Sequence, residues 1–213
     1  MTELTAIQAT VRAFAQRSVR PVLETYDRQP ESGFPWPIVQ QGEAMGLTRM
    51  TVPEAWGGAG MDLVAAGVAL EEMAAVCPGF ATLFAASLWG IAPLVLAADG
   101  AQGRRLLEET PPAEGATTWL AALVAPEMGR TPTVRAIPQG NGYRLEGEAP
   151  FVFNAGVAGL YTLFADAGEG MVCAALPAGS PGLRVGHPIA KLGLQVAPAG
   201  DLTFEGAWVP EEN

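Results

Sequence analysis

The chain has 213 residues, of which 49% are hydrophobic and only 16% are charged, whereas about 25% is usual for soluble domains. So little charge leaves little polar surface to cover a core, and we expect an oligomer or a chain that buries one face against a partner. The formal net charge is −10, and Lys191 is the only lysine. This balance argues against nucleic-acid binding, which needs a basic surface, and against docking on anionic lipid.

Two features bear on the cellular compartment. Cys77 and Cys173 both lie in apolar sequence and form no disulfide framework, which favours a cytoplasmic protein. The N-terminal stretch is amphipathic and carries Glu3, unlike a signal peptide.

Residues 77–98 contain no charge and are long enough to span a bilayer. Prolines and glycines interrupt them and no basic cluster flanks them, so we interpret them as a buried core helix and expect no membrane partner.

The first half of the chain reads as helices. Apolar residues recur at helical spacing near the N-terminus, with Thr2 or Thr5 available as a cap, and Pro21 should end or kink this helix. A short helix to Met45 follows, then a loop at 52–60. The next segments are a helix capped by Asp62, the uncharged helix and a short charged helix. The first helix is predicted from Leu4, Ile7, Val11, Phe14 and Ala15.

From residue 117 the sequence pattern changes to short strand-like runs separated by Pro/Gly turns. Asn-Gly at 141–142 lies between two such runs, which predicts a β-hairpin. We therefore predict an α+β fold, with an N-terminal all-helical domain followed by an antiparallel β-barrel or sandwich-like domain. We place the domains at 1–113 and 114–213, with the boundary in the stretch 109–116.

The sequence contains few signatures of a self-contained active site. The glycines of 57–60 lack the preceding strand of a dinucleotide fingerprint, and the stretch 179–182 is not a nucleophile elbow. His187 is the only histidine, which makes a metal site or a catalytic triad improbable. Glu71 and Glu72 fall on different helix faces, and we interpret them as a solvated face rather than a catalytic pair. We assign no catalytic residue and no metal.

Two long segments carry a resemblance. FPWPIVQQGEAMGLTRMTVPEAWGGAGMD at 34–62 contains a Val-Pro-Glu-x-x-Gly-Gly-x-Gly pattern. GLRVGHPIAKLGLQVAPAGDLTFEGAWVPEEN at 182–213 contains Lys-Leu-Gly-Leu, then a strand that ends in Val-Pro. The chain thus resembles the acyl-CoA dehydrogenase family over nearly its whole length. In that family a second helical domain follows the β domain, so the resemblance implies that the C-terminal helical domain is absent here.

The resemblance also implies a chemistry. Family members use FAD to form an α,β-double bond in an acyl-CoA thioester, with a glutamate as the base that removes the α-proton. In the common family pattern that glutamate belongs to the C-terminal helical domain. The resemblance therefore implies that another chain or domain supplies the base.

One family motif after the first β-strand reads Thr-Glu-Pro-x-(Ala/Gly)-Gly-Ser-Asp, and the matching stretch here is VAPEMGRT at 124–131. Val124 replaces the threonine. The resemblance implies that backbone groups of Leu123, Val124 and Ala125 face the flavin ring, because these contacts need no particular side chain. Arg130 replaces the serine that meets CoA; it either clamps a phosphate, fills the groove or is a surface arginine on a turn.

The second family motif, (Trp/Phe)-Ile-(Thr/Ser)-Asn, is FVFN at 151–154. Phe151 keeps the aromatic ring implied to lie against the flavin. Phe153 replaces a hydroxyl side chain with a bulkier ring, and Ala149 replaces the preceding family lysine. A lost hydrogen bond costs on the order of 1 kcal/mol, so Val124 and Phe153 together are expected to weaken FAD binding, and Phe153 to crowd the ring.

Two functional hypotheses follow. In the first, the chain is part of a flavin-dependent acyl-CoA dehydrogenation assembly, a homo- or hetero-oligomer with an acyl-CoA dehydrogenase-type subunit that acts on acyl-CoA or a similar thioester. In the second, it is a non-catalytic scaffold, regulatory subunit or acyl-CoA-binding relative that has lost FAD. A third class, a stand-alone β-domain binding module, is disfavoured by the apolar helical half.

Overall fold

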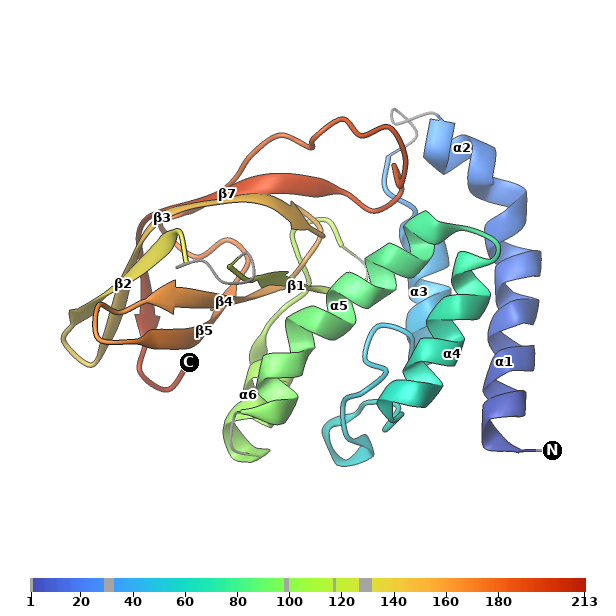
Figure 1. Cartoon of the computed structure of the whole chain (residues 1–213), viewed down its shortest axis with the longest axis horizontal. Helices are drawn as coiled ribbons and strands as arrows, with labels where there is room; N and C mark the ends of the chain where they lie inside the picture. The colour runs from blue at the N-terminus through green and yellow to red at the C-terminus, as the bar shows by residue number, and fades with distance from the viewer. Residues whose placement is uncertain (1, 29–32, 98–99, 117, 127–131) are drawn as a thin grey trace.

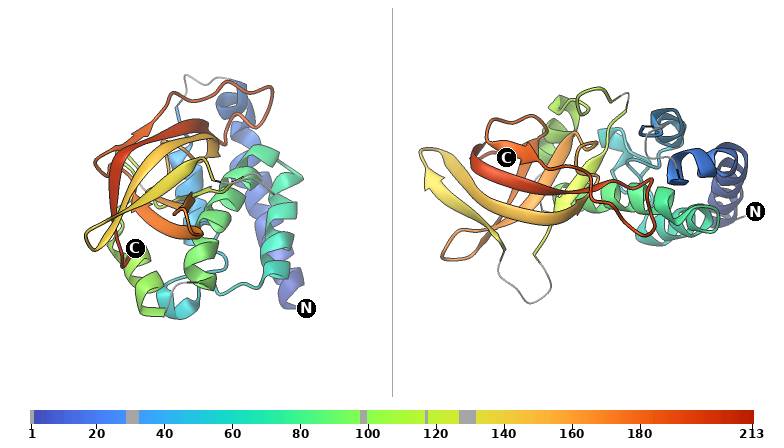
Figure 2. Two further views of the ribbon diagram at one scale, coloured as in Figure 1. Left: turned by 60° about the vertical axis from the view of Figure 1, so that its left-hand side comes forward. Right: turned by 90° about the horizontal axis from the view of Figure 1, so that it is seen from above.

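The computed structural model describes residues 2–28, 33–97, 100–116, 118–126 and 132–213. Helices make up one end of the molecule and a curled sheet makes up the other, as the views in Figures 1 and 2 show. The change from helix to strand falls between Glu109 and Ala121.

The helical part contains six α-helices within the described residues. Thr2 caps the first by accepting a hydrogen bond from the amide of Thr5, and Asp62 caps the fourth through the amide of Ala65 at 2.7 Å. Pro21 does not break the first helix sharply: a π-helical turn, Ala15–Val19, and a 3₁₀ turn, Arg20–Val22, lead into the second. The helices are α1 (Glu3–Phe14), α2 (Leu23–Arg28), α3 (Trp36–Ala44), α4 (Leu63–Ala74), α5 (Pro78–Leu96) and α6 (Gly100–Glu109).

Helix α5 is the uncharged segment singled out in the sequence. It is long and apolar enough to cross a membrane by length and composition, yet 61% of its most apolar window is buried inside this structure. Its large side chains Phe80, Leu83 and Phe84 are at most 1% exposed and join the core of the helical part. In this structure α5 is the core helix that the sequence predicts.

The second half forms one seven-stranded sheet in the order β1-β4-β2-β3-β7-β6, with β5 on the other side of β4. The α+β class is confirmed, but the sheet is mixed rather than purely antiparallel, because β1 and β2 both run parallel to β4. The cause is the hairpin formed by β2 and β3. It lies between β1 and β4 in the sequence and returns the chain to the start of β1, so that β4 runs in the same direction as β1. The strands are β1 (Ala121–Val124), β2 (Val134–Gln139), β3 (Gly142–Phe153), β4 (Leu160–Asp166), β5 (Met171–Pro177), β6 (Leu183–Val185) and β7 (Ala199–Pro210).

The predicted hairpin is present between β2 and β3. Gln139 pairs with Gly142, so the two turn residues are Gly140 and Asn141, one position earlier than the Asn-Gly pair. Gly140 has φ +62°, a conformation that a residue without Cβ adopts easily.

Helix α5 packs directly on β1. A Cβ atom at Gly90 would lie 2.7 Å from Cβ of Ala121 and 2.7 Å from the backbone nitrogen of Ala122. Buried polar groups reinforce the contact: Ser87 Oγ accepts from the amide of Ala121 at 3.1 Å, and Thr162 Oγ1 donates to the carbonyl of Gly90 at 2.7 Å. Helix and strand thus meet backbone to backbone at the start of β1.

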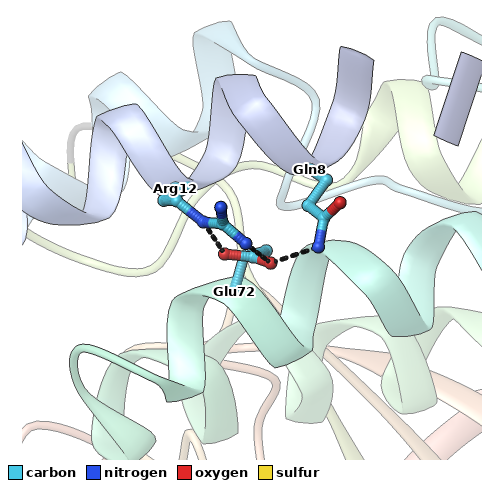
Figure 3. A network of polar contacts seen from close by, with 3 residues as sticks. All are labelled: Gln8, Arg12 and Glu72. Atoms are coloured by element: carbon cyan, nitrogen blue, oxygen red, sulfur yellow. Dashed lines mark hydrogen bonds and ion pairs between the residues drawn. The ribbon is translucent and has the colours of Figure 1, made fainter. Parts of the chain in front are cut away.

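Helix α1 is held against α4 by a polar network (Figure 3). Arg12 donates to both carboxylate oxygens of Glu72, at 2.6 and 2.7 Å, and Gln8 donates to one of them at 2.7 Å. The Glu72 side chain is only 8% exposed. The expectation of a solvated Glu71–Glu72 face is therefore wrong for Glu72, because the two adjacent residues fall on different helix faces and only Glu71 is exposed.

The first prediction concerns Gly90. Gly90→Ala should lower the free energy of unfolding by about 1–3 kcal/mol, because the added methyl group meets backbone that must shift. Gly67→Ala is the matched control: nothing lies within 4 Å of its Cβ position on α4, and it should raise stability by about 0.5–1 kcal/mol. Urea denaturation measures both; equal effects of the two substitutions would contradict the close contact.

The second prediction concerns Glu72. Hydrogen bonds from Arg12 and Gln8 lower the pKa of Glu72 below its ordinary value of 4.5. The stabilisation is therefore fully present above pH 4.5 and is lost as the pH falls through the lower folded-state pKa. We expect Glu72→Gln to be less stable than the parent at neutral pH, and the difference to shrink in acid, in urea denaturation curves recorded over that range.

Glu71→Gln removes the same formal charge from the exposed neighbouring position and should change stability little at any pH. A Glu72→Gln variant whose stability deficit stayed constant into acid would show that the ion pair is not the source of the effect.

Candidate functional site

A cavity of about 300 Å³ opens at the end of β1. Residues 123–126, which end β1 and follow it, form one wall, and residues 149–152 of β3 form another. The fold thus brings together Leu123, Val124, Ala125 and Phe151, four of the five residues implied to contact a flavin.

Phe151 is held in an unusual conformation by an irregularity in β3. Ala149 pairs with Leu202 and Val152 pairs with Gly200, so Pro150 and Phe151 together stand opposite Asp201. Phe151 has φ +55°, which costs a bulky residue on the order of 1–3 kcal/mol. Its amide donates to Asp201 Oδ1 at 2.9 Å, and its ring is left 48% exposed. The strained bulge therefore presents an aromatic surface at the cavity.

Phe153 lies beside this surface but is not among the residues that line the cavity. Its ring meets that of Phe151 edge to face, with centroids 5.4 Å apart and planes at 83°. Phe153 packs against the core of the helical part, as does Val157. Two residues beyond Phe151 along β3, the side chain of Phe153 thus packs toward the helices.

The edge of β1 supplies polar backbone groups. The amide of Ala121 points to Ser87 and its carbonyl accepts from Asn154, both away from β4. Backbone groups alternate in direction along a strand, so the amide and carbonyl of Leu123 also point away from β4. This edge can offer a donor and an acceptor to a planar ligand without help from any side chain.

Asn154 is a residue that sequence reasoning did not select for its role. It is 0% exposed, has φ +62°, and its Nδ2 donates to the carbonyls of Leu83 and Ala121, both at 3.0 Å. One side chain therefore joins α5, β1 and the end of β3. The available signal was its place as the last residue of the FVFN motif.

The remaining residues singled out in the sequence are Arg130 and Ala149. Arg130 lies outside the described residues, so its contact with CoA stays a prediction. Ala149 lines the cavity and is 4% exposed. Among the described residues, no group of three or more His, Cys, Asp or Glu side chains is placed to hold a metal ion.

Comparison with known proteins agrees with this architecture. The family model described as "Acyl-CoA dehydrogenase, N-terminal domain" matches residues 1–111. Cyclohex-1-ene-1-carbonyl-CoA dehydrogenase from Syntrophus aciditrophicus is 31% identical over 228 residues, covering 100% of this chain and 54% of that protein.

Solved structures share the fold. Butyryl-CoA dehydrogenase from Megasphaera elsdenii superposes with a TM-score of 0.84 at 23% identity, covering 100% of this chain and 58% of that one. Acyl-CoA dehydrogenase complexed with FAD from Bacillus anthracis superposes with a TM-score of 0.84 at 25% identity, covering 100% and 37%.

The helical part, the curled sheet and these matches define a chain with the acyl-CoA dehydrogenase fold. The chain belongs to the acyl-CoA dehydrogenase family, which confirms the resemblance inferred from residues 34–62 and 182–213. It spans about half the length of the curated relatives that it matches.

Proposed function

We propose that this chain forms one half of a flavin cleft in an assembly that oxidises an acyl-CoA or similar thioester to its α,β-unsaturated form. The observation that carries the proposal is the meeting of the outward-pointing edge of β1 and the exposed ring of Phe151 around one cavity. A relative named as a CoA-thioester dehydrogenase and a neighbour that binds FAD support it.

The residues present fit an isoalloxazine ring in part. The backbone of Leu123 and Ala125 suits the polar edge of such a ring, and the ring of Phe151 suits its flat face. Bound FAD would supply the hydride acceptor of the reaction. Val124, which lines the cavity, and Phe153, whose ring contacts that of Phe151 beside it, offer no hydrogen bond where the family has hydroxyl side chains, so we expect weak affinity.

The catalytic base is proposed to come from another domain or chain. None of the described residues that line the cavity carries a titratable side chain. Helix α5 also exposes Trp89 (56%) and Leu96 (84%), which lie about two turns apart and so share one face. This apolar face supports assembly with an acyl-CoA dehydrogenase-type subunit. We further propose that 1–113 and 114–213 are the two domains that build this half.

A second candidate function is a non-catalytic relative that keeps the scaffold or an acyl-CoA site. The combination of Val124 and Ala149 at the cavity with Phe153 beside it, at positions where the family has polar side chains, favours it. The visible spectrum of the purified native complex separates the candidates: flavin absorbance supports the first, and a colourless complex that takes up no added FAD leaves only the second.

The third prediction tests the expected weakness of FAD binding. Val124→Thr with Phe153→Thr should strengthen FAD binding by up to about tenfold, since two neutral hydrogen bonds contribute about 1 kcal/mol each and compete with packing losses. Quenching of flavin fluorescence on titration with the protein measures the affinity.

The matched control is Phe153→Val with Val124 unchanged, because valine has nearly the shape of threonine without its hydroxyl group. A gain shared equally by both variants assigns the effect to the bulk of Phe153 rather than to the added hydroxyl groups. Unchanged titration curves for both would refute the claim that these two side chains limit flavin binding.

A further inference from the structure

A second and larger cavity, of about 650 Å³, lies where the turn after β3 approaches α2. It is bounded by Tyr26 of α2, residues 33–35, the turn 155–157 after β3, and the segment 188–198 that joins β6 to β7. Figures 1 and 2 show this last segment arching across from the sheet to α2. The cavity shares no lining residue with the one formed by 123–126 and 149–152.

The walls of this second cavity are largely apolar. Phe34, Val157 and Ile189 line it and are half-buried, and Val196 beside them is 3% exposed. A cavity of this size with apolar walls and few polar groups has the usual make-up of a small-molecule site. The walls suit an apolar body rather than a sugar or a nucleotide base.

Among the described residues that line this cavity, one carries a charge. Lys191 lines it, is the only lysine in a chain of net charge −10, and no acidic side chain is among the described residues that line the cavity with it. Among the described residues, the Lys191 ammonium donates to the carbonyl of Ile189 at 3.5 Å, a distance at the outer limit of a hydrogen bond. Burial lowers the pKa of Lys191, as expected for a cation that has lost water without gaining a carboxylate.

The loop that carries Lys191 is ordered by its own contacts. The side chain of Gln195 donates to the carbonyl of Lys191, and the amide of Ile189 donates to the carbonyl of Ala199 at 2.7 Å. The ammonium is therefore set against the cavity by a fixed backbone.

We propose that this cavity binds an amphipathic monoanion, an acyl chain ending in a free carboxylate, with the carboxylate on Lys191 and the chain between Phe34 and Val157. One cation without an acid selects a single negative charge, and the apolar walls select a hydrocarbon body. This site goes beyond the proposed flavin cleft and requires neither FAD nor a partner subunit.

The fourth prediction is measured by isothermal titration calorimetry of the full chain with octanoate. Octanoate should bind saturably with one site per chain. Butyrate should bind at least tenfold more weakly because its chain buries four fewer methylene groups. Octylamine, with the opposite charge, should not compete. Absence of saturable octanoate binding, or equal competition by octylamine, would overturn the proposal.

Substitutions locate the site. Lys191→Gln should weaken octanoate binding about tenfold or more, because a charge-assisted hydrogen bond is lost, and Lys191→Arg should retain it. Arg184→Gln is the charge-matched control, because it removes a cation that pairs with Glu205 at 2.7 Å on the neighbouring strands, and it should bind normally.

Val157→Phe provides a test that leaves Lys191 intact: it fills the cavity and should weaken octanoate more than butyrate. If Lys191→Gln or Val157→Phe bound octanoate as the parent does, with unchanged thermal stability, the site would lie elsewhere and the proposal would be wrong. FAD titration of the same variants stays a separate readout, so failure of the flavin proposal would not affect this one.

Discussion

The close approach of α5 to β1 is the constraint on which the rest of the structure depends. With only hydrogen at Gly90, the helix backbone comes within van der Waals distance of Ala121. A helix this close to a strand excludes water, so each polar group at the contact needs a protein partner. Ser87 and Thr162 provide such partners between α5 and the sheet. The direction in which β1 presents its outward edge follows from this arrangement.

Asn154 extends the same constraint to both cavities. Its side chain donates hydrogen bonds to a carbonyl of α5 and to a carbonyl of β1. The strand before it carries the strained bulge at Phe151, and the turn after it borders the cavity of Lys191. A conformation as unfavourable as that of Phe151 persists only when rigid surroundings determine it. The buried hydrogen bonds of Asn154 and the hydrogen bond from the Phe151 amide to Asp201 supply that rigidity. The two proposed ligand sites therefore border the two chain segments that meet at Asn154, the strand before it and the turn after it.

The sequence predicted those features whose causes are local. The caps at Thr2 and Asp62, the hairpin after Gln139 and the burial of α5 follow from spacing and side-chain chemistry within a few residues. The α+β class and the family also followed from motifs that read as contiguous segments. A dipeptide signal does not locate a turn to better than one residue, which accounts for the shift of the hairpin turn by one position.

Features that depend on distant segments were not predictable. The parallel pairing of β1 with β4 depends on where the hairpin between them returns the chain, and the burial of Glu72 depends on α1 bringing Arg12 to it. At the candidate site, motif matching selected the residues around the cavity but not the direction of Phe153, since the bulge before it changes which face each side chain takes. The cavity of Lys191 joins four separate segments, and a single lysine carries no sequence pattern.

Native-state hydrogen exchange tests the central claim most directly, because it reports which amides open together. The amide of Ala121, bonded to Ser87, should exchange with the same opening free energy and the same urea dependence as the amide of Leu94 inside α5. That result is expected if helix and strand open as one unit. Exchange of Ala121 through a smaller opening, while α5 stays protected, would show that the contact does not hold β1 in place and would contradict the account.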